Sequence, residues 1–247
     1  MDLGRGGNPV LYLIPGLLDS VYGLDQFSEA QRERLGRLDH LIVESEKEAR
    51  RTLKALLPGS DLNRWTLHLW NEHSKAEDLH AVLEPMRQGL SMGLMSDAGC
   101  PAVADPGSVL VLEAHRQGWR VEPVSGPSSL LLAWMASGLN GQRMEFHGYL
   151  PVDARARQSR LQEMEQRSRL LHHTQIWIET PYRNTVMLEA ALRCLQAETL
   201  LCLACDLNGG PREWIRTMTV GAWNRYCLTG ESFSLHKRPC VFLMQSP

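Results

Sequence analysis

Short apolar runs rich in β-forming residues alternate with longer amphipathic stretches through most of this chain. Residues 10–14 have the composition of a buried strand, and residues 46–57 have the apolar spacing of a helix. This alternation is typical of β-α-β units around a mainly parallel sheet, so the sequence predicts an α/β fold. In the first half, the pattern predicts strands over 10–14, 40–43, 65–69, 92–95 and 120–124, and helices over 26–35, 46–57, 74–88 and 108–117.

The helix expected over 74–88 has the most distinct start in the sequence. Ser74 is followed three residues later by Glu77, which is the spacing of a capping box. Gly89 stands just past the expected end, where glycine commonly terminates a helix. We therefore expect one continuous helix here.

A proline-containing turn, Ser125-Gly126-Pro127, interrupts the pattern after the fifth strand, and an apolar helix is expected over 128–136. Domains of roughly 100 to 150 residues are the commonest size. We therefore expect an N-terminal lobe over 1–125 and a C-terminal lobe over 126–247. The pattern of the second lobe predicts strands over 145–149, 175–179, 200–206, 214–219 (antiparallel to a neighbour) and 239–245, and helices over 154–168 and 184–196.

The formal net charge of −2 gives the chain no global positive field of the kind that drives non-specific binding to nucleic acids. Any contact with RNA must therefore be local. Two stretches are rich in basic residues, and each is also compatible with a solvated helix face. They comprise Arg50, Arg51 and Lys54, and Arg155, Arg157, Arg160, Arg167 and Arg169.

The six cysteines are scattered rather than spaced as a disulfide framework, so we expect them to be reduced. Cys202 and Cys205 have the spacing of a redox or zinc pair. Residues three apart in a strand point to opposite faces, however, which favours core packing for this pair. No apolar run approaches the roughly 20 residues that span a bilayer, and residues 1–8 do not resemble a signal segment, so we expect a cytoplasmic protein.

The most informative segment runs from Ser96 to Gly107, at the expected carboxyl end of the strand 92–95. Open α/β sheets bind ligands at that edge. The small residues of the segment let the backbone approach a ligand closely, and the carboxylates of Asp97 and Asp105 can accept hydrogen bonds from ribose hydroxyls or a ligand amine. A tight connection with an aspartate cap before the next helix is the alternative interpretation.

Two further strands are followed by turns of similar composition. The first turn, Ser125-Gly126-Pro127-Ser128-Ser129, opens a helix whose N-terminus and hydroxyls can hold an anion such as a carboxylate, unless Ser128 is a plain N-cap. The second, Glu179-Thr180-Pro181-Tyr182-Arg183, ends the strand 175–179. There Arg183 can steer a substrate phosphate or pair with a surface carboxylate.

With these turns, and with Ala136-Ser137-Gly138-Leu139 and Phe146-His147-Gly148-Tyr149-Leu150-Pro151, the chain resembles the tetrapyrrole methylase superfamily of S-adenosylmethionine-dependent methyltransferases. Within it, the chain is similar to the ribosomal RNA small-subunit methyltransferase I branch, which methylates a cytidine 2′-hydroxyl of 16S rRNA. The resemblance implies two α/β lobes, with a mainly parallel N-terminal sheet, a mixed C-terminal sheet and a cofactor cleft between them. It also implies a homodimer, with RNA or a ribosomal subunit as substrate.

The resemblance implies cofactor contacts from several turns. Asp97 and Ala98 would line S-adenosylmethionine, Ser128 and Ser129 would face its methionine end, and Leu150 with the backbone of 179–181 would face its adenine. The expected cofactor-binding residues are Pro15, Gly16, Asp97, Ala98, Gly99, Val103, Ala104, Asp105, Gly126, Pro127, Ser128, Ser129, Tyr149, Leu150, Glu179, Thr180 and Pro181, and Arg183 is expected to contact the substrate.

The sequence departs from the family in three places. Its first loop, residues 14–19, lacks the family's Pro-x-Gly-Asn pattern, and Cys100 stands where the RNA enzymes have threonine. The extra C-terminal helical module of many RNA enzymes has no counterpart after Met244. The missing module and the near-neutral charge keep open a small-molecule acceptor such as a tetrapyrrole precursor. Cofactor binding without catalysis is a further alternative, because the sequence does not single out a general base.

Methyl transfer from a sulfonium is an in-line displacement that requires alignment of donor and acceptor but no metal. Because a ribose hydroxyl is a poor nucleophile, a nearby base would help. The expected catalytic residues are Asn71, Glu72 and His73, which follow the strand 65–69, and a plain surface role is the alternative for His73. The chain lacks the phosphate-loop, dinucleotide and nucleophile-elbow motifs, which disfavours kinase, dehydrogenase and hydrolase functions.

Overall fold

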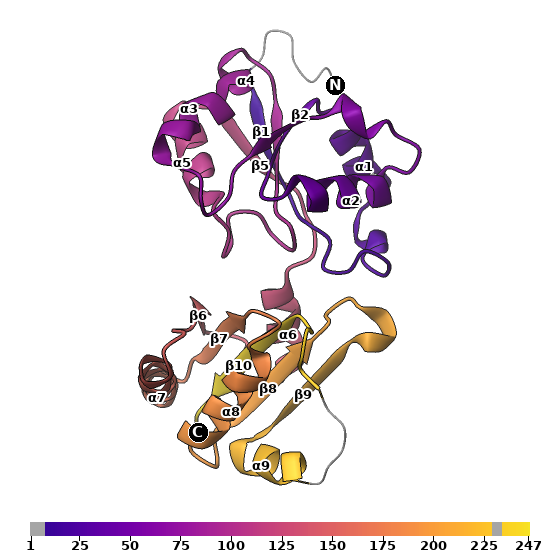
Figure 1. The fold of residues 1–247 in the computed structure, drawn as a ribbon. Helices are drawn as coiled ribbons and strands as arrows, with labels where there is room; N and C mark the ends of the chain where they lie inside the picture. The colour runs from indigo at the N-terminus through magenta and orange to yellow at the C-terminus, as the bar shows by residue number, and fades with distance from the viewer. Residues whose placement is uncertain (1–7, 229–233) are drawn as a thin grey trace. The chain divides into compact units, whose positions relative to one another are not determined.

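Two five-stranded sheets organise the chain, one in each half (Figure 1). The computed structural model describes residues 8–228 and 234–247. The chain divides into two compact units, residues 1–128 and 129–247, whereas the expected lobe boundary lies after residue 125. Over the described residues, no helix combines the length and apolar character needed to cross a membrane.

The N-terminal sheet is entirely parallel, in the order β3-β2-β4-β1-β5. All five strands predicted for this half are present; the central strands β2, β4 and β1 are short apolar runs that the sheet buries, whereas the edge strands β3 and β5 are partly exposed. β4 is buried along its whole length. The strands are β1 (Val10–Ile14), β2 (His40–Val43), β3 (Thr66–Leu69), β4 (Met92–Met95) and β5 (Arg120–Pro123).

Helices cover both faces of this sheet (Figure 1). On one face, α1 (Glu29–Gly36) and α2 (Glu46–Leu56) pack against alternate strand residues such as Tyr12 and Leu41. On the other face, α3 (Leu79–Val82), α4 (Glu84–Arg87) and α5 (Ser108–Arg116) pack against Leu11 and Ile42. This alternation is the period-2 pattern of strands buried on both sides.

The continuous helix expected over 74–88 is wrong, because the segment is broken into η3 (Ala76–Asp78), α3 and α4. Pro85 accounts for the break between α3 and α4, since a proline lacks the N–H and its ring clashes with the preceding turn. Ser74 does not cap this segment. Its Oγ accepts from the Asn71 N–H at 3.0 Å, and the Asp78 carboxylate instead accepts from the Lys75 N–H at 2.9 Å.

A serine capping box begins α1 instead. Ser28 Oγ accepts from the Gln31 N–H at 3.3 Å, and Gln31 Oε1 accepts from the Ser28 N–H at 2.8 Å. The helix expected over 26–35 therefore starts later, after the short helix η1 (Leu24–Gln26). A second short helix, η2 (Leu62–Arg64), precedes β3.

The C-terminal sheet is mixed, as expected, and its strand order is β6-β7-β10-β8-β9. β6 and β7 are parallel, and the remaining pairs are antiparallel. The strands are β6 (Met144–Tyr149), β7 (Thr174–Glu179), β8 (Leu200–Cys205), β9 (Trp214–Thr219) and β10 (Cys240–Gln245).

Four helices pack on the C-terminal sheet. α7 (Ala154–Leu171), α8 (Asn184–Cys194) and α9 (Val220–Leu228) enclose the main core around Trp177, Trp223 and Phe242, and α6 (Ser129–Ser137) covers the other face (Figure 1). α9 was not predicted. One further short helix, η4 (Gly210–Arg212), precedes β9.

None of the six cysteines forms a disulfide, as expected. Cys205 belongs to the main core, where its Sγ lies 3.0 Å from Cys240 Sγ. Cys202 is also buried, but it stands three residues earlier in β8 and faces the opposite side of the sheet. The pair therefore has a packing role and not the geometry of a paired thiol site.

Candidate functional site

The order of the N-terminal strands places a topological switch point between the neighbouring strands β2 and β4. After β2 the chain continues to β3, at one edge of the sheet, and after β4 it continues to β5, at the opposite edge. In open α/β sheets, ligands bind outside the carboxyl ends of the strands where the connections diverge in this way. Glu44 follows β2 and Asp97 follows β4, so both stand at this position.

Three turns meet at the carboxyl edge of the N-terminal sheet. Gly16, after β1, and Gly99, after β4, exchange two backbone hydrogen bonds of 2.8 and 3.1 Å. Cys100 Sγ lies 3.6 Å from the carbonyl oxygen of Pro127, after β5. Gly126 packs so closely on Pro15 that an added Cβ would lie 2.6 Å from its ring. The sequence-predicted residues of these turns are therefore brought together.

The loop from Ser96 to Gly107, here called the β4 loop, is braced by its own polar groups. Asp105 Oδ1 accepts hydrogen bonds from the N–H groups of Ala102 at 3.1 Å and Gly107 at 2.6 Å. Ser96 Oγ donates to the Gly99 carbonyl at 2.7 Å. Trp70 Nε1 donates to the Pro106 carbonyl at 3.0 Å. Because bonds of this kind fix the backbone before any ligand arrives, the loop is preorganised.

Two alanines of the β4 loop have left-handed backbone conformations, with φ of 64° at Ala102 and 56° at Ala104. A β-carbon makes this region costly by about 1 to 2 kcal/mol per residue. Such strain is typical of functional loops whose surroundings hold them in place. The outer surface of this loop, including Asp97, Ala98, Val103 and Ala104, is exposed, so its backbone is accessible to a ligand.

Three carboxyl groups gather where β2 and β4 end. The Asp97 N–H donates to Glu44 Oε1 at 3.1 Å, and the Asp97 carboxylate accepts from the Ser45 N–H. Burial, together with the carboxylates of Asp105 and Asp97, raises the pKa of Glu44 to about 7. Burial also raises the pKa of Asp97, aided by the nearby Glu48 and Asp105 carboxylates. Perturbed carboxyls of this kind are a mark of functional sites.

Glu44 was missed by the sequence analysis. It stands directly before Ser45 and the acidic first turn of α2, where a glutamate is expected as a favourable helix-terminal charge. The available signal was its position immediately after the buried run that ends at Val43. Only the strand order shows that this position lies beside Asp97.

The expected catalytic residues lie after β3, at the outer side of the same sheet. Asn71 Oδ1 accepts from the His73 N–H at 3.0 Å and forms a local turn. The side chains of Glu72 and His73 are each 84% exposed, with 3.6 Å between Glu72 Oε1 and His73 Nε2. β2 separates this turn from the β4 loop in the sheet. Their catalytic role stays a prediction.

The turn after β5 leads into α6, which starts at Ser129. Gly126 is exposed, Pro127 is buried, and Ser128 and Ser129 are half-buried. Gln31 Nε2 donates to the Ser125 carbonyl at 2.6 Å and ties this turn to α1. The methionine-end role expected for the two serines stays a prediction.

In the C-terminal unit, the segment expected at the adenine follows an irregular part of β6. The register between β6 and β7 shifts after Phe146, and Gly148 has a positive φ of 61°. Tyr149 is 58% exposed, whereas Leu150 is buried in the main core. Leu150 therefore has a packing role, whatever its backbone contacts.

The turn after β7 is organised by a buried ion pair. Glu179 Oε2 lies 2.8 Å from an Arg183 guanidinium nitrogen, and Glu179 Oε1 accepts from the Thr180 N–H at 2.7 Å. The Pro181 carbonyl accepts from the Lys237 N–H at 3.1 Å. Arg183 was expected either to steer a substrate phosphate or to pair with a surface carboxylate. In the structure it pairs with a carboxylate, and that carboxylate, Glu179, is buried.

The basic stretches are largely committed to contacts within the protein. Arg157 is buried and donates to the Val152 carbonyl, Arg160 contacts Glu163, and Arg167 contacts Glu145. On α2, Arg51 pairs with Glu48 at 2.6 Å. Arg51, Arg160 and Arg167 agree with the alternative of a solvated helix face, whereas Arg157 is buried.

Comparison with solved structures defines the class of fold. The chain is similar to the solved structure of the methyltransferase CobJ, with a TM-score of 0.61 and 17% sequence identity, over 97% of this chain and 95% of that one. Such low identity shows the fold alone. The fold, with its parallel and mixed sheets, is that of the tetrapyrrole methylases.

Sequence comparison defines the family. The chain is 32% identical over 214 residues to ribosomal RNA small subunit methyltransferase I of Mesorhizobium japonicum, covering 87% of this chain and 68% of that protein. It is also 32% identical over 203 residues to the protein of the same name from Vibrio cholerae, covering 82% of this chain. The chain belongs to the ribosomal RNA small subunit methyltransferase I family.

The match spans 66% of the Vibrio cholerae protein, just under two thirds of its length. No family model matches the chain.

Proposed function

We propose that this chain binds S-adenosylmethionine at the carboxyl edge of its N-terminal sheet and transfers the methyl group to ribosomal RNA. The observation that carries the proposal is the convergence of the turns after β1, β4 and β5 around a braced loop. Family membership supports the reaction, because the relatives are named as ribosomal RNA methyltransferases.

The residues at this edge fit the cofactor chemically. S-adenosylmethionine carries a sulfonium, an ammonium group and ribose hydroxyls, and Asp97 offers a carboxylate to such groups. The exposed small residues Ala98 and Ala104 leave main-chain groups open to a close ligand. The remaining proposed contacts are the turn residues 126–129 and, from the C-terminal unit, Tyr149, Leu150 and the backbone of 179–181.

When bound, the cofactor supplies an electrophilic methyl group on sulfur. The task of this chain is then to hold donor and acceptor in line and to remove the acceptor's proton. The braced β4 loop performs the first task, because its position is fixed by Asp105 and Trp70 before the ligand binds. For the second, we propose His73 or Glu72 at the end of β3, with Asn71 holding their turn.

We also propose that RNA or the small ribosomal subunit is the acceptor, that the protein is a homodimer, and that it acts in the cytoplasm. These proposals rest on the family. They are independent of the cofactor site, so any of them can be wrong while the proposed cofactor site holds.

The acceptor is tested by transfer of labelled methyl groups from S-adenosylmethionine to small ribosomal subunits lacking the modification. We expect label in 16S rRNA, and His73→Ala should slow transfer by about 100-fold, the size of a general-base contribution. Label in a tetrapyrrole but not in RNA would overturn the RNA proposal. Transfer at the normal rate by His73→Ala and by Glu72→Ala would exclude both as the base.

The cofactor site is tested by calorimetry with S-adenosylhomocysteine. We expect Asp97→Ala to weaken binding by about tenfold, equivalent to about 1.4 kcal/mol. Asp39→Ala is the matched control, because Asp39 precedes β2 at the opposite edge of the same sheet and its side chain is 72% exposed. Equal affinities for the wild type and both variants would exclude Asp97 as a contact.

A further inference from the structure

Asp105 presents two carboxylate oxygens with different surroundings. Oδ1 accepts two backbone N–H groups of the β4 loop. Oδ2 is buried, and within the described part of the chain it has no N–H donor. The group within hydrogen-bonding reach of this carboxylate is the Glu44 carboxyl.

Two carboxyl groups can share a hydrogen bond only if one of them carries a proton, since two carboxylates offer acceptors alone and repel each other. Glu44 is the better proton carrier. N–H donors stabilise the charged form of a carboxyl group, and Asp105 Oδ1 accepts two of them whereas Glu44 Oε1 accepts one, so the negative charge is better placed on Asp105.

Within residues 8–228 and 234–247, neither Glu44 nor Asp105 forms an ion pair with a cation. Asp97 faces Glu44 from the β4 loop, and Glu48 and Arg51 face Asp97 from α2. The Arg51 guanidinium is engaged with Glu48 at 2.6 Å. A proton, rather than a cationic side chain, therefore offsets the repulsion between the Glu44 and Asp105 carboxyl groups.

We propose that Glu44 and Asp105 share one proton, and that this carboxyl–carboxylate hydrogen bond positions the β4 loop for the cofactor. Glu44 is thus a positioning residue, acting through Asp105 and the Asp97 backbone. The cofactor part of this inference rests on the proposed function; the shared proton does not.

The proton makes the loop sensitive to pH in a defined direction. Because the pKa of Glu44 is raised from 4.5 to about 7 in the folded chain, the proton is held more tightly when the chain is folded than when it is unfolded. Its contribution to stability is full below pH 4.5 and is lost as the pH rises through about 7. Above that pH, two carboxylates face each other and the β4 loop loses one of its supports.

The experiment compares the full chain with Glu44→Gln and Glu44→Ala between pH 6 and pH 8.5. Glutamine keeps an N–H donor for Asp105 and an oxygen for the Asp97 N–H, but it cannot ionise. Glu46→Gln is the matched control, because Glu46 is an exposed acid in the first turn of α2. Thermal unfolding reports on the shared proton, and calorimetry with S-adenosylhomocysteine reports on the cofactor.

For wild type, we expect the unfolding temperature and the affinity for S-adenosylhomocysteine to fall as the pH rises, with an affinity loss of about tenfold. Glu46→Gln should follow wild type. Glu44→Gln should match wild type at pH 6 and show less than about a twofold loss of affinity by pH 8.5. Glu44→Ala should be impaired at both pH values. This pattern is not produced by a purely steric role, since only the titrating side chain is sensitive to pH.

Two outcomes would overturn the proposal. If Glu44→Gln keeps the wild-type pH dependence of unfolding, the proton is not on this pair. If its unfolding loses the pH dependence while its affinity still falls with pH as in wild type, the pair does not position the cofactor loop. Absence of S-adenosylhomocysteine binding to wild type at every pH would defeat the proposed function, while the unfolding data would still decide the shared proton.

Discussion

The two units carry polar clusters of opposite character. In the N-terminal unit, the carboxyls of Glu44, Asp97 and Asp105 crowd together at the carboxyl edge of the sheet. In the C-terminal unit, His147 lies between Arg160 and Gln175, with Nδ1 2.8 Å from the guanidinium and Nε2 2.7 Å from the amide oxygen.

The difference lies in how the charges are compensated. Around His147, Arg160 contacts Glu163 and Arg167 contacts Glu145, so each cation has an anion. In the acidic cluster, like charges are held together, and burial with the neighbouring carboxylates raises the pKa of Glu44 to about 7. Compensated charges of the first kind support a scaffold, whereas uncompensated ones need a reason to persist, such as a cationic ligand. This contrast supports the proposed site at the N-terminal cluster and a structural role for Arg160 and Arg167.

The largest effect is expected when a side chain is added where the β1 and β4 turns pack backbone to backbone. In Gly16→Ala, the added Cβ would lie 2.4 Å from the Ser96 carbonyl oxygen, so the β1 and β4 turns must separate. We expect a loss of about 3 kcal/mol in the free energy of unfolding and loss of S-adenosylhomocysteine binding. Denaturant unfolding and calorimetry measure both. Gly141→Ala, where a Cβ meets nothing within 4 Å, is the control.

A smaller loss is expected when the brace of the β4 loop is removed. Asp105→Ala leaves the N–H groups of Ala102 and Gly107 without their acceptor, which should cost about 2 kcal/mol in the free energy of unfolding. Denaturant unfolding provides the measurement. Asp153→Ala, which removes a cap from α7 in the C-terminal unit, should leave cofactor affinity unchanged. Weaker binding of S-adenosylhomocysteine by that variant would contradict a purely structural role for α7.

A gain in stability is expected from relieving backbone strain. Because Ala102 has a φ of 64°, Ala102→Gly should stabilise the folded chain by about 1 kcal/mol. The control Ala30→Gly, at an exposed position of helix α1, should have the opposite sign, with a loss of about 0.5 kcal/mol. Denaturant midpoints distinguish the two, and a loss in both variants would show that the strain is absent.

The smallest effect concerns the pH dependence of stability that arises from His147 and its neighbours Arg160 and Gln175. Burial, reinforced by Arg160, lowers the pKa of His147. The neutral ring is therefore favoured by folding, and its contribution is present above the unfolded pKa of about 6.5 and lost as the pH falls below it. We expect acid to destabilise wild type more than His147→Gln in thermal unfolding. The sign is opposite to that for Glu44, and equal acid sensitivity of the two proteins would contradict it.

Most of the fold follows from the apolar pattern of the sequence. The runs at 10–14 and 92–95 could be recognised as strands because a parallel sheet buries both of their faces. The helix over 74–88 was overestimated, since an apparent capping signal at Ser74 outweighed the break at Pro85. The helix α9 was missed because its segment follows β9 directly, without a turn signal.

The candidate site could be predicted only in part. The β4 loop was recognisable from its small residues and aspartates. The internal role of Asp105 was considered only as the alternative of a tight connection with an aspartate cap, and the sequence did not show which N–H groups its carboxylate bonds. Glu44 required the strand order, since β2 and β4 are neighbours in the sheet but far apart in the chain.

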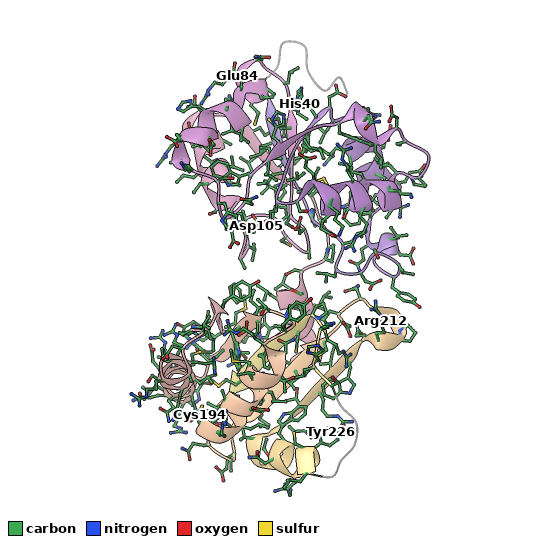
Figure 2. The ribbon with its side chains drawn as sticks, in the orientation of Figure 1. His40, Glu84, Asp105, Cys194, Arg212 and Tyr226 are labelled. Atoms are coloured by element: carbon green, nitrogen blue, oxygen red, sulfur yellow. The ribbon has the colours of Figure 1, made fainter. Side chains whose placement is uncertain are left out.

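The most direct test of the central claim is backbone amide NMR of the deuterated protein during titration with S-adenosylhomocysteine. We expect the largest shifts at Gly16, Ala98 and Ala104, with little change at His40 at the opposite end of the N-terminal sheet, as Figure 2 shows relative to Asp105. Shifts concentrated on α7, with the β4 loop unaffected, would contradict the account.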